Sequence, residues 1–232
     1  KRGLFALARR ADVESRLVVR RAGRWLVRHG PIARALLGRV PRRDWTLLVN
    51  GVNLHCAPAE NLLRRFAFVP QARLDDVMVS FAAPGGGVGA HYDSYDVFLL
   101  QGAGRRVWRL ERARRFAPVP GAPLRLIADF RPQEEYLLEP GDLLYLPPAW
   151  GHEGVALDAS WTYSIGFRAP RRAELAAAFL DYLHERGFAG REYRDPDLTP
   201  ATRSGRIERT MLRFAEDAIG RIKWSRRDVQ AL

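Results

Sequence analysis

Residues 85–93, GGGVGAHYD, carry the clearest indication of the fold. A glycine-rich turn leads into a histidine and an aspartate that lie two positions apart. Side chains two apart in a β-strand point to the same face, so His91 and Asp93 can both point into a barrel. The stretch therefore predicts a β core that carries a neutral imidazole and a carboxylate side by side.

A second stretch, EPGDLLYLPPAWGH at residues 139–152, supplies a matching histidine. It predicts a tight turn, a buried strand, a Pro-Pro stop and then His152. Two histidines and one carboxylate form the facial triad that is typical of non-haem Fe(II) oxygenases, with three coordination positions open. We therefore take His91, Asp93 and His152 as candidate metal ligands and catalytic residues. The other histidines, His29, His55 and His184, have no such context and are expected to be structural or exposed.

A third stretch, GAGRRVWRL at residues 102–110, carries three arginines, one of which shares a strand face with a tryptophan. If it forms a strand, Arg106 and Trp108 share one face and the neighbouring arginines share the other. Buried arginine is rare unless it is paired, and a bound dicarboxylic acid could pair with Arg106 through two hydrogen bonds. The residues alone leave a second interpretation open, in which all three arginines are solvated or pair with surface acids.

Around these stretches the pattern is that of an antiparallel sandwich or barrel, because many short strands alternate with Gly- and Pro-rich turns. A hairpin with Ala22-Gly23 at its turn is expected early in the chain. The expected strands are residues 16–20, 24–28, 45–49, 77–81, 91–100, 106–110, 124–130, 135–138, 142–146, 154–157 and 161–167.

Helical spacing appears before the β-rich segment and after it. Residues 58–66 predict a short helix, residues 171–186 a longer one, and Ser204 could cap another that runs to about residue 219. We therefore expect three parts: an N-terminal flanking segment (1–40), a β catalytic domain (41–170) and a helical region (171–232).

Composition limits the class of protein. The 232 residues are 47% hydrophobic and 28% charged, as in ordinary globular proteins. No apolar run reaches eighteen residues, which argues against a membrane partner, and a single cysteine argues against a disulfide framework and favours a cytoplasmic location. The sequence begins without methionine, so we expect it to be part of a longer protein. The net charge of +12 has two interpretations: proximity to RNA or the ribosome, or an arginine-rich codon composition.

Together, residues 85–93, the 141–152 segment and the run YSIGFRAP at 163–170 resemble the JmjC/cupin-type 2-oxoglutarate oxygenases, most of all the bacterial ribosomal oxygenases. The resemblance extends over about residues 10–200 and is strongest at 74–170. One departure is Ala149, at a position where the usual cupin pattern has glycine.

This resemblance implies a mainly β fold, a double-stranded β-helix (cupin or JmjC jelly roll) with flanking helices. It implies Fe(II) held by His91, Asp93 and His152, and O₂ and 2-oxoglutarate as co-substrates. Arg106 would bind the distal carboxylate of 2-oxoglutarate with help from Ser80. The implied reaction is hydroxylation of an arginine β-carbon in a ribosomal protein of the large subunit. The resemblance also implies a homodimer formed through the helices that follow the core, which lead to a C-terminal domain that these residues do not complete.

A substrate arginine needs acceptors or aromatic faces near the metal, and Tyr95 and Asp96 are candidates for that role. Their alternative interpretation is that of ordinary strand residues. Other functions also remain open from the sequence: histidine hydroxylation or lysine demethylation by the same chemistry, a metal-binding cupin that uses a basic surface to bind RNA without turnover, or a metal-dependent isomerase that would not need Arg106.

Overall fold

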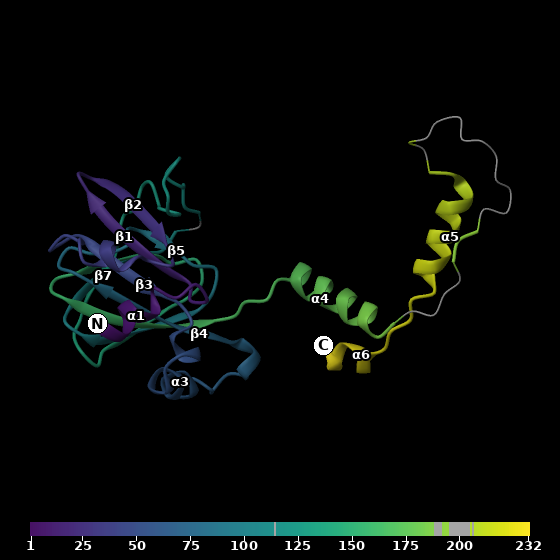
Figure 1. Ribbon diagram of the computed structural model, residues 1–232, viewed down its shortest axis with the longest axis horizontal. Coiled ribbons are helices and arrows are strands. Elements are labelled where there is room, and N and C mark those ends of the chain that lie inside the picture. The colour runs from purple at the N-terminus through teal and green to yellow at the C-terminus, as the bar shows by residue number, and fades with distance from the viewer. Residues whose placement is uncertain (114, 188–191, 195–204, 206) are drawn as a thin grey trace. The chain divides into compact units, whose positions relative to one another are not determined.

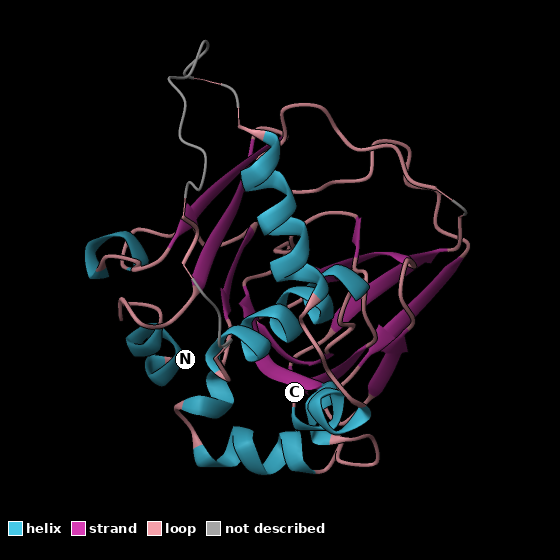
Figure 2. Ribbon diagram, turned by 90° about the vertical axis from the view of Figure 1, so that its right-hand side faces the viewer, coloured by secondary structure: helices cyan, strands magenta, loops and turns pink. Residues whose placement is uncertain are grey.

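The computed structural model describes residues 1–113, 115–187, 192–194, 205 and 207–232. These residues divide into two units, Lys1–Ala169 and Pro170–Leu232 (Figure 1). Among the described residues, all strands belong to the first unit, and the regular elements of the second are helices. Figure 2 shows the strands in magenta and the helices in cyan. Within the described part of the chain, no helix is both long enough and apolar enough to cross a membrane.

The larger sheet of the first unit has seven antiparallel strands. In spatial order they are β2 (Arg24–His29), β1 (Ser15–Arg21), β3 (Trp45–Val49), β4 (Leu74–Ala82), β11 (Ser160–Phe167), β6 (Val97–Ala103) and β9 (Leu143–Leu146). The expected hairpin is present, since Arg21 pairs with Arg24 across the Ala22-Gly23 turn. The strands of the segment 1–40 therefore extend the same sheet that carries β3 and β4.

The smaller sheet has four antiparallel strands and carries the two histidines of interest. Its order is β5 (His91–Tyr92), β10 (Gly151–Ala156), β7 (Arg106–Glu111) and β8 (Glu134–Leu138). An apolar cluster joins the two sheets, with Leu99 and Leu146 from the larger sheet and Trp108, Leu110 and Leu138 from the smaller one. The prediction of a mainly β, antiparallel core is confirmed.

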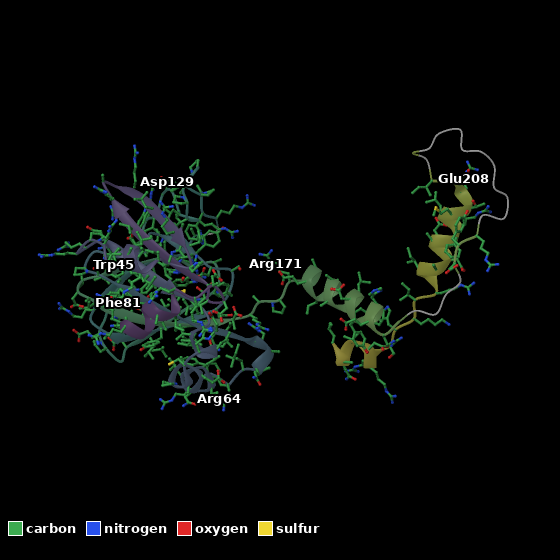
Figure 3. The ribbon with its side chains drawn as sticks, viewed as in Figure 1. Trp45, Arg64, Phe81, Asp129, Arg171 and Glu208 are labelled. Atoms are coloured by element: carbon green, nitrogen blue, oxygen red, sulfur yellow. The ribbon has the colours of Figure 1, made fainter. Side chains whose placement is uncertain are left out.

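The main apolar core lies on the outer face of the larger sheet. Helices α1 (Arg2–Leu7) and α3 (Ala57–Arg64) cover that face and pack against side chains such as Leu47. Trp45 and Phe81, both labelled in Figure 3, contact each other there with ring centroids 5.4 Å apart. Short segments complete this unit: α2 (Arg34–Leu37) and the 3-10 turns η1 (Val52–Leu54) and η2 (Gln71–Arg73).

Beside the apolar cluster that joins the two sheets, part of the inner face of the larger sheet is polar, although it is equally buried. Thr162 pairs with Ser80 on one side and with Gln101 on the other, and Ser160 lies one row further along β11. All four side chains are buried, with exposed fractions of at most 4%. A polar inner face of this kind prepares the space between the sheets for a polar or charged occupant, since buried polar groups need partners.

Two strand predictions were wrong. Residues 91–100 do not form one strand: β5 ends at Tyr92, and β6 begins at Val97 in the other sheet. The polar run DSYD at 93–96 favours the turn between them. Residues 124–130 form no strand and make only the bridge between Ile127 and Pro118, because the prolines of this loop cannot donate hydrogen bonds to a ladder.

The second unit contains α4 (Arg172–Glu185), α5 (Arg209–Gly220) and α6 (Arg226–Ala231). Arg171 and Glu208, labelled in Figure 3, are the residues before α4 and α5. The expected helix at 171–186 is confirmed. The cap expected at Ser204 lies outside the described residues. Several large apolar side chains of this unit are exposed, and α5 buries none of its residues.

Candidate metal and co-substrate site

Three side chains converge where β5 and β10 run side by side. His91 and His152 are directly opposed across this strand pair, and their ring centroids lie 4.2 Å apart. Asp93 follows β5 and places its Oδ2 3.7 Å from Nε2 of His152. One ligand atom from each of the three lies within 4.8 Å of the others, which is a spacing that can hold a metal ion.

Backbone carbonyls orient both imidazole rings. Nδ1 of His91 lies 2.9 Å from the carbonyl oxygen of Gly89, and Nδ1 of His152 lies 3.0 Å from that of Trp150. A carbonyl oxygen can only accept, so each Nδ1 must carry the proton and donate it. The Nε2 lone pairs then remain available as metal ligands.

Burial keeps His152 neutral. Its side chain is 3% exposed, and burial, helped by nearby His91, lowers the pKa of His152 to about 3. The hydrogen bond to Trp150 opposes this shift but does not overcome it. A neutral imidazole is the form that binds a metal, so His152 is ready for coordination at neutral pH.

The backbone around the histidines is close-packed. A Cβ on Gly86 would lie 2.1 Å from the carbonyl oxygen of Trp45, and one on Gly87 would lie 2.4 Å from that of Gly154. These two glycines therefore allow the chain to pass between the sheets just before His91. Ala149 has a φ of 62°, in the left-handed region that favours glycine, which explains why the usual cupin pattern has glycine at this position.

Arg106 lies inside the protein, between the two sheets. Arg106 and Trp108 are buried, and Val107 and Arg109 between them are partly exposed, as the strand parity predicts. Nη1 of Arg106 donates to Oγ of Ser80 (3.1 Å), and Nη2 donates to Oγ of Ser160 (3.2 Å). Two hydroxyl groups from the larger sheet thus hold a guanidinium that belongs to the smaller one.

No acidic side chain among the described residues lies within ion-pair distance of Arg106. Burial lowers its pKa to about 10, and its Nε has no hydrogen-bond partner. Nε1 of Trp108 is also buried without a partner, and this indole lies between Arg106 and His152, 5.9 Å and 6.0 Å away respectively. The surroundings of Arg106 therefore present donors and a positive charge without an acidic side chain among the described residues.

The two candidates for substrate binding differ in their surroundings. Asp96 already accepts a hydrogen bond from Tyr145 Oη (2.6 Å) and lies 3.7 Å from Arg73. Tyr95 is partly exposed, and its pKa is raised by burial and by the negative charges of Asp93 and Asp76. The charges of Asp93 and Asp76 therefore both act on Tyr95, whereas Asp96 is engaged with Tyr145 and Arg73.

The sequence interpretation missed two residues. Ser160 holds Arg106 together with Ser80, but its only signal is its place at the start of a buried strand. Asp76 accepts a hydrogen bond from the Gly51 N–H, and burial nevertheless raises the pKa of its carboxyl group. Its sequence signal is the acidic pair Asp75-Asp76 in front of a buried strand, which alone does not identify a site.

The lowered pKa of His152 predicts a pH dependence of stability for the metal-free protein. Between its folded pKa and the ordinary value of about 6.5, His152 binds a proton only in the unfolded state. The unfolded state then binds more protons, so this contribution to the free energy of unfolding is complete above pH 6.5 and falls with decreasing pH. Through this group, the free energy of unfolding changes with pH with a slope of at most about 1.4 kcal/mol per pH unit.

Urea unfolding of chelator-treated protein between about pH 5 and 7 measures this slope. His152→Gln should flatten it, whereas the matched change His29→Gln, at an exposed histidine, should leave it unchanged. Equal slopes in the parent and in His152→Gln would show that His152 titrates normally in the folded state.

Comparison with known proteins identifies relatives of this chain. The family model for the JmjC domain matches residues 61–175. The ribosomal protein uL16 3-hydroxylase of Escherichia coli is 44% identical over 85% of this chain and 52% of its own length. A probable ribosomal oxygenase of Haemophilus influenzae is 35% identical over 84% of this chain and 47% of its own length. The chain thus spans about half the length of these curated relatives.

Solved structures agree with these relatives. The X-ray structure of E. coli ycfD superposes with a TM-score of 0.80 at 38% identity, over 98% of this chain and 61% of that one. A structure of the same protein in complex with cobalt and 2-oxoglutarate gives a TM-score of 0.72 at 39% identity, over 94% and 57%. The expected JmjC fold is confirmed: residues 61–175 match the JmjC domain, and ribosomal oxygenases are among the proteins to which the chain is similar.

Proposed function

We propose that this chain is an Fe(II)- and 2-oxoglutarate-dependent oxygenase that hydroxylates the β-carbon of an arginine in a large-subunit ribosomal protein. The observation that carries the proposal is the pairing of two sites. One is the His-Asp-His cluster, and the other is Arg106, a buried arginine without an acidic partner, on the other side of Trp108. An E. coli relative bears the name of such a hydroxylase, and its fold has been seen with cobalt and 2-oxoglutarate.

The residues present fit a divalent metal. His91, Asp93 and His152 offer two oriented imidazole nitrogens and one carboxylate from one edge of the smaller sheet. The donor set is that of the 2-His-1-carboxylate iron sites. Bound Fe(II) supplies the oxygen chemistry, with O₂ and 2-oxoglutarate as co-substrates. The protein holds the ligand geometry and shields His152 from water.

The residues also fit 2-oxoglutarate. Arg106 is a buried cation with an orphaned Nε, and the hydroxyls of Ser80 and Ser160 lie next to its terminal nitrogens. The far carboxylate of a dicarboxylic acid would supply the missing negative charge and accept from these groups. The near end of the same molecule would then point past Trp108 toward the histidines.

Tyr95 and Asp76 suit the substrate side chain. Asp76 has a carboxyl group whose pKa burial raises, so an incoming guanidinium would stabilise its ionised form. Besides burial, its charge and that of Asp93 both raise the pKa of Tyr95, which supports a role for the phenol next to the metal cluster. Tyr95 would contact the substrate arginine directly. Asp96, engaged by Tyr145, would support the pocket wall through that hydrogen bond.

The direct test is incubation with Fe(II), 2-oxoglutarate and ribosomal proteins in air, followed by mass spectrometry. We expect a gain of about 16 Da, the mass of one oxygen atom, on an arginine residue of a large-subunit protein. His152→Ala should abolish it, and His29→Ala, at an exposed histidine, should retain it. Normal turnover in a folded His152→Ala protein would refute the metal assignment, and metal binding without consumption of 2-oxoglutarate would indicate a non-catalytic cupin.

Arg106 tests the co-substrate separately. Each charge-assisted hydrogen bond contributes about 1.5–3 kcal/mol, so Arg106→Ala should weaken 2-oxoglutarate binding roughly ten- to several-hundred-fold in a calorimetric titration. The affinity of Arg106→Lys should lie between that of Arg106→Ala and that of the parent, because lysine keeps the charge but loses the two parallel donors of the guanidinium. Arg109→Ala is the matched control, since Arg109 lies on the same strand but pairs with Glu135 at the surface. Unchanged affinity in Arg106→Ala would rule out this binding mode.

We further propose that the helices of residues 171–232 form a homodimer. Within that unit, Leu180 is 61% exposed and Ile219 is 68% exposed, and single chains seldom leave contiguous apolar faces open to water. Light scattering should give about twice the chain mass of 26.3 kDa, and Ile219→Glu should shift it toward the monomer. A monomer mass at all concentrations would contradict the dimer.

A further inference from the structure

The excess of basic over acidic residues in this chain is concentrated in two segments. Residues 20–43 contain eight arginines and no acidic residue, and residues 112–133 contain five arginines and one aspartate. These two segments account for the whole formal net charge of +12, and the remaining residues carry 25 basic and 25 acidic groups. An arginine-rich codon composition would raise arginine along the whole chain, so it does not explain this segregation.

The fold brings the two segments together beside the metal cluster. A Cβ on Gly89 would lie 3.0 Å from the ring of Trp25, on β2, and 2.7 Å from Leu126, in the 112–133 loop. The N–H of Ile127 donates to the carbonyl oxygen of Ala90 (2.8 Å), one residue before His91. The hairpin and the loop therefore meet at the two residues that precede the first histidine.

Their arginines lack acidic partners. Among the described residues, no guanidinium group of either segment lies within 4.0 Å of an Asp or Glu carboxylate oxygen. In the rest of the described chain, acid partners are found for Arg10, Arg64, Arg73, Arg105, Arg109, Arg168, Arg171, Arg186 and Arg221. We use the name arginine rim for six exposed side chains of the two segments: Arg20, Arg21, Arg24, Arg43, Arg115 and Arg125.

Backbone contacts hold part of the rim in place. The N–H of Arg20 donates to the carbonyl oxygen of Asp44 (2.8 Å), which ties the 42–44 turn to the hairpin. Nη2 of Arg43 lies 3.9 Å from the position of a Cβ on Gly85, in the glycine-rich run that leads to His91. The positive charges are thus attached to ordered elements at the approach to the site.

Aromatic rings accompany these charges. The guanidinium of Arg20 lies over the ring of Trp25, 5.7 Å from its centroid. Tyr92 is 46% exposed, and its ring centroid lies 5.2 Å from that of Phe116, in the loop. Guanidinium groups bind phosphates through paired hydrogen bonds, and aromatic faces stack on unpaired bases.

We propose that the arginine rim is a docking surface for RNA. The phosphates of the bound RNA contact the rim, and the RNA then lies beside the metal cluster. The choice of RNA among anionic polymers rests on the proposed function, because a ribosomal protein substrate is surrounded by RNA in its assembled state. An acidic protein surface would satisfy the charges but would make no use of the aromatic rings for base stacking.

Fluorescence anisotropy with a labelled single-stranded oligouridylate tests the proposal on the full chain, without turnover. The rim variant combines Arg21→Gln, Arg24→Gln, Arg115→Gln and Arg125→Gln. The control variant combines Arg172→Gln, Arg209→Gln, Arg213→Gln and Arg226→Gln, which are also exposed and without acid partners in the described structure but lie in the second unit. Both variants lose the same formal charge, so they separate the position of the charge from its amount.

We expect the rim variant to raise the Kd for RNA at least about tenfold at 0.1 M salt, and to lower the slope of log Kd against log salt by about 3. The control should stay within about twofold of the parent. Equal effects of the two variants would overturn the proposal. So would competition by polyglutamate as strong as that by oligouridylate of equal charge, which would indicate an acidic protein partner.

Turnover of an RNA-free substrate peptide distinguishes this proposal from the proposed function. The rim variant should hydroxylate such a peptide at least as fast as the parent, because the rim touches neither metal nor 2-oxoglutarate. If neither protein hydroxylates the peptide while the rim variant alone loses RNA binding, the proposed reaction fails and the rim stands. If both hydroxylate it and bind RNA equally well, the rim fails and the reaction stands.

Discussion

Arg106 is held between two sheets by hydroxyl groups alone, and the desolvation of its guanidinium is the constraint on which the rest of the site depends. Removing such a charge from water costs several kcal/mol unless an opposite charge accompanies it. Ser80 and Ser160 satisfy hydrogen-bond donors but contribute no charge. The fold therefore leaves the positive charge of Arg106 uncompensated, and the carboxylate of a bound dicarboxylic acid would compensate it. This buried charge favours an anionic ligand between the sheets.

The larger sheet tolerates this arrangement because its two faces are built differently. The outer face is apolar and packs against α1 and α3, so the hydrophobic stabilisation of the unit comes from there. The inner face carries Ser80, Thr162 and Gln101, which hydrogen-bond among themselves and to the backbone. Stability and ligand binding are thus assigned to opposite sides of the same strands, and only the smaller sheet has to place the metal ligands.

Sequence reasoning succeeded where the information lies within one strand. The alternation in residues 106–110 predicted that Arg106 and Trp108 share one face, and the resemblance to the oxygenases implied that this face points inward. The HYD motif placed two side chains at one strand end. Ser160 was missed because its contact with Arg106 joins strands 54 residues apart in different sheets, which no local pattern encodes. The break at residues 93–96 was missed because apolar content alone does not show that a chain changes sheets. Residues 124–130 were predicted as a strand, but they lie in the 112–133 loop, whose prolines prevent a ladder.

The charge distribution poses a problem that the geometry helps to resolve. The proposed substrate group is a cation, and the short-range field at the site suits it, since Asp93 and Asp76 both act on Tyr95. At longer range the arginine rim repels it. At physiological salt, charges interact over a screening length of about 8 Å, so a free cationic peptide meets the rim before it meets the carboxylates. A substrate arginine that is surrounded by phosphates is attracted at both ranges, because the rim attracts the phosphates and the carboxylates attract the arginine. The rim therefore favours an arginine presented next to RNA over the same arginine on a free chain, and electrostatic steering of this kind acts on the rate of association more than on the chemistry itself.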